Sequence, residues 1–213
     1  ANWVALFSGI AGTTVADANT ATITDGTVEW VWAMAEYSSY LIDEYTSTIR
    51  IIDSGGLQGG YGIRMIDSGG GANPPAFLRC MNVEFDHVST AGISLEGGGQ
   101  AEFEQTFVTS MLNGPAIQIL DTFDGLWRFN GGVLFGSGVE LMTIAAPYGV
   151  LSNFIMSGGG IFTLDTYDAI RVDANTTDFQ IVACAISASP GDAVPTTRYG
   201  ISIATGCDNY LIQ

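Results

Sequence analysis

The sequence contains no lysine, and its positive charge is limited to six arginines. Against these stand 22 aspartates and glutamates, so the formal net charge is -16 at pH 7. A protein that binds nucleic acid needs a positive surface to release counterions from the phosphates, so this composition argues against that class. Charged residues make up only 13% of the chain and hydrophobic residues 47%, which excludes a disordered acidic tail.

Metal ligands and long apolar runs are also scarce. His87 is the only histidine, and the three cysteines (Cys80, Cys184 and Cys207) show no CxxC spacing, so no zinc site is expected. The glycine triplets lack the Lys-Ser/Thr of a phosphate-binding loop, and neither a metal nor a cofactor is predicted. No apolar run reaches the ~18–20 residues of a membrane helix, so no membrane insertion is expected.

Five segments of the chain share a short pattern of small residue, isoleucine, polar residue and aliphatic residue. A degenerate sixth copy covers Val139–Ile144, and neighbouring copies lie 24 to 31 residues apart. This variable period suits a solenoid whose turns differ in loop length. We expect the five isoleucines to stack in register in the interior, each more than about 90% buried. They are Ile63, Ile93, Ile117, Ile170 and Ile201.

Two further short strands follow each anchor. The second begins nine or ten residues later, after turn-forming residues such as Asp173–Asp178. It includes Phe103, Leu126–Phe129, Leu151, Phe179–Val182 and Tyr210–Ile212. A third run follows glycine breaks, at residues 131–135 and 158–162. Three short strands per ~25–30 residues predict an all-β solenoid in which each strand pairs in parallel with its equivalents.

The coil pattern resembles that of the right-handed parallel β-helix of the pectin-lyase-like superfamily. The resemblance rests on Asp168–Val182 and Tyr199–Gln213 and extends over residues 47–213. It implies a right-handed, single-stranded parallel β-helix but no fixed activity, because the superfamily includes lyases, hydrolases, epimerases and catalytically silent fibres. The 28 glycines and the acidity are most similar to the β-helical part of phage tailspikes and tail fibres.

Residues 1–46 do not share the repeat and carry an aromatic block from Trp30 to Tyr45. We expect a capping or attachment segment here, since the open end of a β-helix exposes unpaired strand edges. A helical turn at Ala33–Tyr37 is one option, and an ordinary first pair of coils is the alternative. The chain ends inside a strand-like run at Leu211–Gln213, so we expect the β-helix to continue beyond it.

The catalytic motifs of the pectin-lyase-like enzymes are missing. Lysine is absent, and there is no Asp-Asp pair, no Gly-His-Gly and no Arg-Ile-Lys. Tailspike glycosidases need only two or three carboxylates on adjacent coils. If Phe85 and Phe103 point inward, strand alternation places Glu84, Glu102 and Glu104 on the outer face of one sheet.

A second group of candidates lies in the following turn. Asp121 and Asp124 are further possible catalytic carboxylates, and Trp127 and Arg128 just beyond them are ligand-binding candidates. Carboxylates beside an aromatic ring and an arginine are typical of a sugar cleft. In a chain with 22 carboxylates, the same grouping is also expected on a solvated acidic face.

The leading hypothesis is a virion structural and adhesion protein, a tailspike or tail-fibre module that recognises a host surface glycan. It would act outside the cell as a homotrimer, beside other tail proteins. One alternative is a polysaccharide depolymerase, either a carboxylate-based glycoside hydrolase or a lyase. Another is a non-catalytic bacterial surface adhesin. The net charge favours neutral or weakly acidic polymers as ligands.

Overall fold

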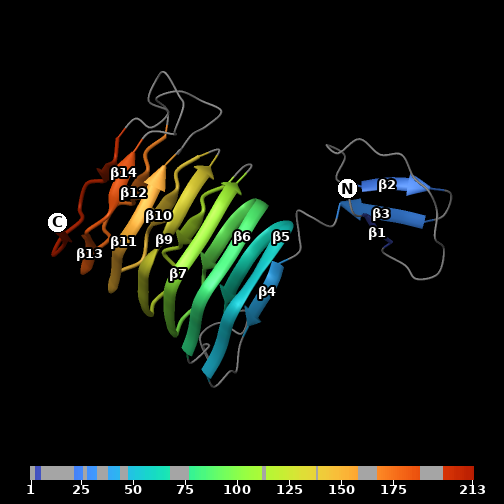
Figure 1. Cartoon of the computed structure of the whole chain (residues 1–213), viewed down its shortest axis with the longest axis horizontal. Coiled ribbons are helices and arrows are strands. Elements are labelled where there is room, and N and C mark those ends of the chain that lie inside the picture. The colour runs from blue at the N-terminus through green and yellow to red at the C-terminus, as the bar shows by residue number, and fades with distance from the viewer. Residues whose placement is uncertain are drawn as a thin grey trace.

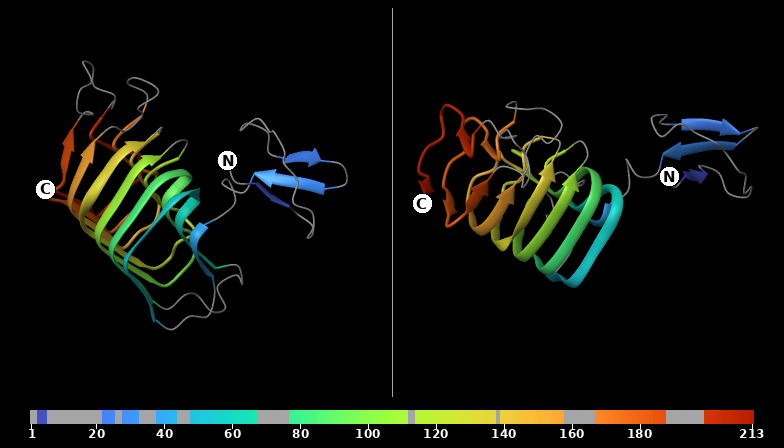
Figure 2. Two further views of the ribbon diagram at one scale, coloured as in Figure 1. Left: turned by 45° about the vertical axis from the view of Figure 1, so that its right-hand side comes forward. Right: turned by 45° about the horizontal axis from the view of Figure 1, so that its top comes forward.

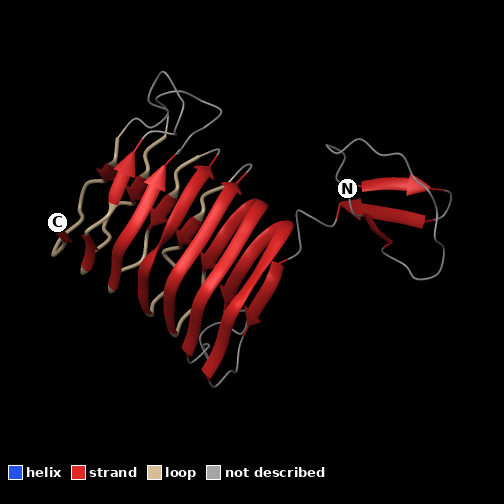
Figure 3. Cartoon of the chain, viewed as in Figure 1, coloured by secondary structure: helices blue, strands red, loops and turns tan. Residues whose placement is uncertain are grey.

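A computed structural model describes residues 3–5, 22–25, 28–32, 38–43, 48–67, 77–111, 114–137, 139–157, 167–187 and 199–213. Side chains are described from residue 38 onward, except at residues 43, 57, 58, 110 and 111. Every regular element in these ranges is a β-strand (Figure 3). Within the same ranges, no helix is long and apolar enough to cross a membrane. The fold of the described chain is therefore all-β, as predicted.

Two separate sheets are formed (Figure 1). The smaller is antiparallel with strand order β1-β3-β2, and its strands are β1 (Trp3–Ala5), β2 (Thr22–Asp25) and β3 (Val28–Trp32). The larger contains every later strand in parallel pairing. Its strands are β4 (Ser38–Asp43), β5 (Thr48–Ile66), β6 (Phe77–Leu95), β7 (Gln100–Met111), β8 (Ile117–Ile119), β9 (Leu126–Ser137), β10 (Met142–Ile144), β11 (Gly149–Ser157), β12 (Ile170–Val172), β13 (Phe179–Val182), β14 (Ala185–Ser187), β15 (Ile201–Ile203) and β16 (Leu211–Ile212).

The larger sheet coils into a parallel β-solenoid of about five turns (Figure 2). Bends divide each coil into successive strand segments, and equivalent segments of neighbouring coils stack into three faces. We call these faces the first, second and third sheets, in their order along the coil, starting from the segment that contains the isoleucine anchor. The first sheet contains β4, β8, β10, β12, β15 and the last parts of β5 and β6. The second contains β13, β16 and the first parts of β5, β6, β7, β9 and β11. The third contains β14 and the segments that follow the second sheet in β5, β6, β7, β9 and β11.

The isoleucine ladder occurs as predicted in the first sheet. Ile63 pairs with Ile93, Ile93 with Ile117, and Ile170 with Ile201, while Met142 of the degenerate copy joins Ile117 to Ile170. All members except Ile201 are fully buried. Ile201 is only partly buried because β15 is the edge strand of the sheet, and no strand of the described residues pairs with its other side. The expectation of burial was wrong for this one residue.

A second interior ladder runs through the second sheet. Phe103 and Phe129 are in register and stack with ring centroids 4.5 Å apart and planes 6° from parallel. Leu151 and Ile181 continue the column, and both are buried. The predicted second strands therefore occupy equivalent positions in successive coils.

At the bend between the second and third sheets, equivalent residues of successive coils adopt the left-handed backbone conformation, with positive φ. Asp53, Asn82, Gln105 and Asn153 all have φ between 49° and 59°. The side chains of the first two stack, and the Asn82 amide donates a 2.8 Å hydrogen bond to the Asp53 carboxylate. Asn and Asp tolerate this backbone region better than most residues, which explains their use at this bend.

The solenoid begins before residue 47. Strand β4 pairs in parallel with the last part of β5, so residues 38–43 belong to the first sheet although the repeat pattern did not include them. Residues 154–157 pair with 132–135 as the third run of their coil, whereas the expected run at 158–162 lies outside the described residues. The helical turn proposed at Ala33–Tyr37 and the exposure of Trp30 and Trp32 also lie outside them.

Candidate functional site

The carboxylates of Glu102 and Glu104 lie on the outer face of the second sheet and form ion pairs with arginine. Arg79 contacts Glu102 at 3.5 Å and Glu104 at 3.3 Å, and Arg128 contacts Glu102 at 3.8 Å. Arg79, Glu102 and Arg128 occupy equivalent positions on β6, β7 and β9, and Glu104 lies two residues further along β7, so the contacts cross from coil to coil. The two glutamates therefore link neighbouring strands and are balanced by two guanidinium groups.

Asp121 and Asp124 lie in the turn between β8 and β9, as predicted, and both are exposed. Phe123 between them is fully buried and fixes the turn on the core. This turn lies at the bend between the first and second sheets. The structure consequently distributes the predicted carboxylates over separate places and does not gather them at one cleft. Within the described ranges, no group of three or more His, Cys, Asp and Glu side chains could hold a metal ion.

Trp127 is a core residue, which corrects the expectation that it contacts a ligand. Its side chain is only 2% exposed, and its indole nitrogen donates a 3.3 Å hydrogen bond to the Ala146 carbonyl. Its ring fills the space above Gly149, where a methyl group would lie 1.7 Å from the indole. Arg128, the other predicted ligand contact, has an exposed side chain that faces solvent.

Glu84 lies beyond the bend at Asn82, on the outer face of the third sheet. The prediction that it shares one sheet with Glu102 and Glu104 was wrong, because the left-handed residue turns the strand before Glu84. The inward orientation of Phe85 and Phe103 was correct, since both are fully buried. Glu84 is exposed and pairs in register with Gly55 on β5 and Phe107 on β7.

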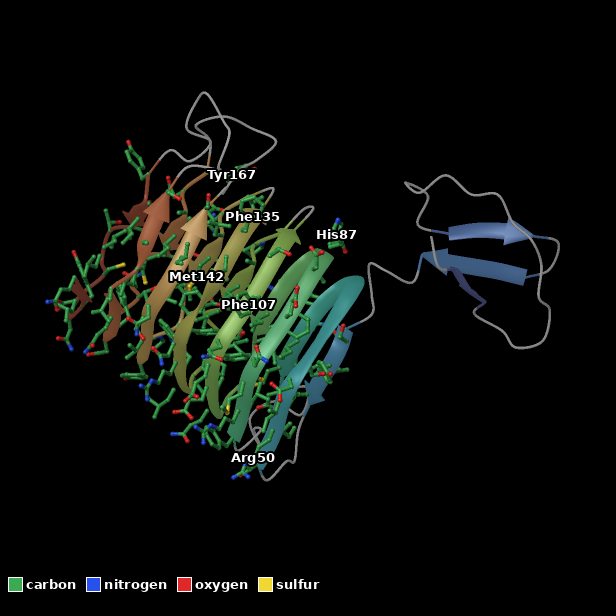
Figure 4. The ribbon with its side chains drawn as sticks, viewed as in Figure 1. Arg50, His87, Phe107, Phe135, Met142 and Tyr167 are labelled. Carbon is green, nitrogen blue, oxygen red and sulfur yellow. The ribbon has the colours of Figure 1, made fainter. Side chains whose placement is uncertain are left out.

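An open hollow of about 840 Å³ surrounds Glu84. Carboxylates, a carboxamide, a hydroxyl and one aromatic ring converge on it. Its lining consists of Asp53, Ser54, Gly55, Gly56, Asn82, Glu84 and Phe107, which we call the groove. The Phe107 ring is 37% exposed and lies midway along β7 (Figure 4).

Two glycines allow neighbouring coils to approach closely beside Glu84. A methyl group at Gly55 would lie 2.2 Å from the Glu84 carbonyl oxygen, so a side chain there would collide with the neighbouring strand. A methyl group at Gly56 would lie equally close to the Ser39 hydroxyl of β4. Glycine at these positions allows β5 to lie close to β6 on one side and to β4 on the other.

A different polar cluster covers the outer face of the first sheet. Arg64 binds the Glu96 carboxylate through two 2.8 Å hydrogen bonds, and the Ser94 hydroxyl donates a third of 2.6 Å. Gln118 of β8 donates to Ser94 at 2.8 Å. Burial raises the pKa of Glu96, but the hydrogen bonds from Arg64 and Ser94 outweigh burial and hold that pKa below its usual value. These groups satisfy one another and leave no open site.

Sequence reasoning named Glu84 but missed Asp53, Asn82 and Phe107, which share its groove. Phe107 is three residues after Glu104, and a regular alternation would not reveal that it shares a column with Glu84. The available signal was the Gly55–Gly56 pair, since two glycines in a strand indicate a close approach or an open surface.

Comparison of the chain with protein-family models, curated proteins and solved structures finds no match.

Proposed function

We propose that this chain is an adhesion module of a virion, part of a tailspike or tail fibre, that recognises a glycan on the host surface. The observation that carries the proposal is the groove on the third sheet, where an exposed phenylalanine ring lies beside hydrogen-bonding oxygens on a rigid scaffold. The resemblance of the coils to those of phage tailspikes supports the same assignment. A binding role is favoured over catalysis at Glu102 and Glu104 because arginines engage both carboxylates.

The chemistry of the groove suits a carbohydrate. The Phe107 ring can pack against the C–H face of a sugar, and the oxygens of Asp53, Asn82 and Glu84 can accept hydrogen bonds from its hydroxyls. The groove is open, so it can accommodate a segment of a long polymer whose ends extend into solvent. Stacked coils hold these side chains in place without ligand, which reduces the ordering cost of binding.

The test is a screen of purified bacterial envelope polysaccharides against the full chain, with affinities measured by calorimetry. Phe107→Ala is expected to weaken binding of the selected polymer by about tenfold, equivalent to about 1.4 kcal/mol. Tyr148→Ala is the matched control, because Tyr148 is an exposed aromatic outside the groove and its loss should leave the affinity unchanged. Equal losses in both variants, or no binding polymer at all, would contradict the proposal.

A depolymerase is the second candidate, and one observation favours it: two carboxylates, Asp53 and Glu84, line the same groove. Paired carboxylates can serve as acid and base in glycoside hydrolysis. Glu84→Gln keeps the shape of the side chain but cannot transfer a proton. If the protein releases reducing ends from the selected polymer and Glu84→Gln binds but does not cleave, the enzyme assignment replaces the adhesin.

We further propose that three copies assemble, so that weak single sites gain avidity. Support comes from apolar side chains on the outer face of the third sheet beyond the groove, where Ile155 is 57% exposed beside Val133 and near Phe135. Light scattering should give three times the 22.4 kDa mass of one chain. Ile155→Glu should shift the mass toward the monomer, and a wild-type monomer would contradict the assembly.

A further inference from the structure

We propose that Arg50 and Arg79 form a subsite for the carboxylate of an acidic sugar, adjoining the groove. The inference deepens the proposed function, on which it rests, by naming the ligand as a polymer that carries a uronate next to a neutral sugar. The two arginines pair in register on β5 and β6, on the outer face of the second sheet. Together with Ile52 and Met81 they line a second hollow of about 210 Å³.

The two arginines at this hollow differ in how their charges are balanced. Like charges directly opposite each other on neighbouring strands destabilise a sheet. The Arg79 charge is balanced by Glu102 and Glu104, but no carboxylate of the described residues lies within ion-pair distance of Arg50. The Nε atom of Arg79 is buried and makes no hydrogen bond within the described part of the chain, but it lies 3.5 Å from a Glu102 carboxylate oxygen. Arg50 therefore carries the one positive charge at this hollow that has no carboxylate partner among the described residues.

Guanidinium groups match the geometry of a carboxylate, because their parallel N–H bonds reach both of its oxygens. The rest of the hollow suits the ring of the same sugar. Ile52 and Met81 pair in register on the same outer face, and both are exposed. An apolar surface beside two cations fits a ligand with one anionic edge and one C–H face. An inorganic anion would use the arginines alone.

The second hollow and the groove adjoin along the same two strands. Asp53 and Asn82 of the groove directly follow Ile52 and Met81 in sequence, at the bend between the second and third sheets. We call the continuous surface from Arg50 to Gly55 on β5 and from Arg79 to Glu84 on β6 the β5–β6 strip. At about 3.3 Å per residue it spans at most about 17 Å, the length of a short oligosaccharide. Arg50 lies at one end of β5, and Phe107 lies midway along β7 (Figure 4).

The experiment follows the side-chain Nε–H signals of the arginines by NMR while the full chain is titrated with sodium glucuronate. Signals of Arg50 and Arg79 should shift with saturation, and that of Arg128, an exposed arginine outside the hollow, should not. Glucose should shift none of them. Arg50→Gln should weaken glucuronate binding by about tenfold, whereas Arg128→Gln should leave it unchanged. Absence of saturable shifts, or equal shifts with acetate and phosphate, would overturn the acidic-sugar subsite.

A second arm separates this inference from the proposed function. The polysaccharide chosen in the screen is compared with its carboxyl-reduced form on wild type and on Arg50→Gln. The subsite predicts that reduction and Arg50→Gln each weaken binding, with little added effect when they are combined. A polymer that binds the groove equally well after reduction would overturn the subsite while the adhesin stands. Saturable glucuronate shifts without any binding polymer would support the subsite and overturn the adhesin.

Discussion

The outer faces of the first and third sheets carry polar side chains on the same coils but satisfy them differently. On the first sheet, Arg64 and Glu96 bind each other through two hydrogen bonds, and Ser94 and Gln118 extend the network. On the third sheet, Glu84 faces an open groove beside the exposed Phe107 ring. Polar groups that satisfy one another stabilise the coil stack, whereas polar groups beside an open apolar surface are available to a ligand.

The largest loss of folding stability should come from a substitution in the buried core that lies beneath both outer faces. Ile117 is fully buried between Ile93 and Met142, and Ile117→Asp would place an uncompensated charge there at a cost of several kcal/mol. We expect loss of the cooperative thermal transition followed by circular dichroism. Ile117→Val, the matched control, should cost about 1 kcal/mol and keep the transition. A normal transition in Ile117→Asp would contradict the stacked ladder.

Replacement of a core glycine should have the next largest effect. The Gly149→Ala methyl group would lie 1.7 Å from the Trp127 ring, and the overpacked core should lose about 1–3 kcal/mol in urea unfolding. Gly200→Ala is the matched control, because its methyl group would meet Ile186 at 3.7 Å, an ordinary contact. If the two variants unfold at the same urea concentration, Trp127 is not packed on Gly149.

The comparison of the two faces is tested by paired glutamate variants. Glu96→Gln should destabilise the fold by about 1 kcal/mol at pH 7, whereas Glu84→Gln should change stability by less than about 0.5 kcal/mol. The folded pKa of Glu96 lies below the usual 4.5, so its stabilisation is fully present above that pH. The stabilisation is lost as the pH falls through the folded pKa. The difference between wild type and Glu96→Gln should therefore shrink below about pH 4.5, and a difference independent of pH would contradict the network.

The smallest effect is expected on the second sheet. Arg128 contacts Glu102 at 3.8 Å and is exposed, so Arg128→Gln should cost about 0–0.5 kcal/mol in urea unfolding. A loss as large as that of Glu96→Gln would mean that the ion pairs of this face hold the coils together as strongly as the hydrogen-bonded network does.

The repeat pattern predicts which residues face the interior of the coils, because it can be read from a few neighbouring residues in each coil. The spacing of Ile63, Ile93 and Ile117 follows directly from one residue per coil at an equivalent position. Burial of Trp127 also had a local signal, since it lies two residues before the inward Phe129 and strand alternation places both on the same face. The position of Trp127 just beyond Asp121 and Asp124 predicts instead a contact with a ligand, and the burial of its side chain contradicts that prediction.

The groove could not be predicted in the same way. Its residues come from three coils, and their meeting depends on how a left-handed bend at Asn82 redirects the strand. A period-2 pattern carries no information about such a bend, and it therefore predicts that Glu84 lies on the same sheet as Glu102. The register of Gly55, Glu84 and Phe107 across three strands is a property of the stacked fold.

In our proposal a glycan binds in the groove and along the β5–β6 strip, and not on the outer face of the first sheet, where the polar groups satisfy one another. The most direct measurement is a crystal structure of the chain soaked with oligosaccharide fragments of the polymer selected in the screen. We predict sugar density over Phe107 and Glu84, continuing across the bend toward Arg50. Density confined to the face of Arg64 and Glu96, or to any surface outside the groove and the β5–β6 strip, would contradict this prediction.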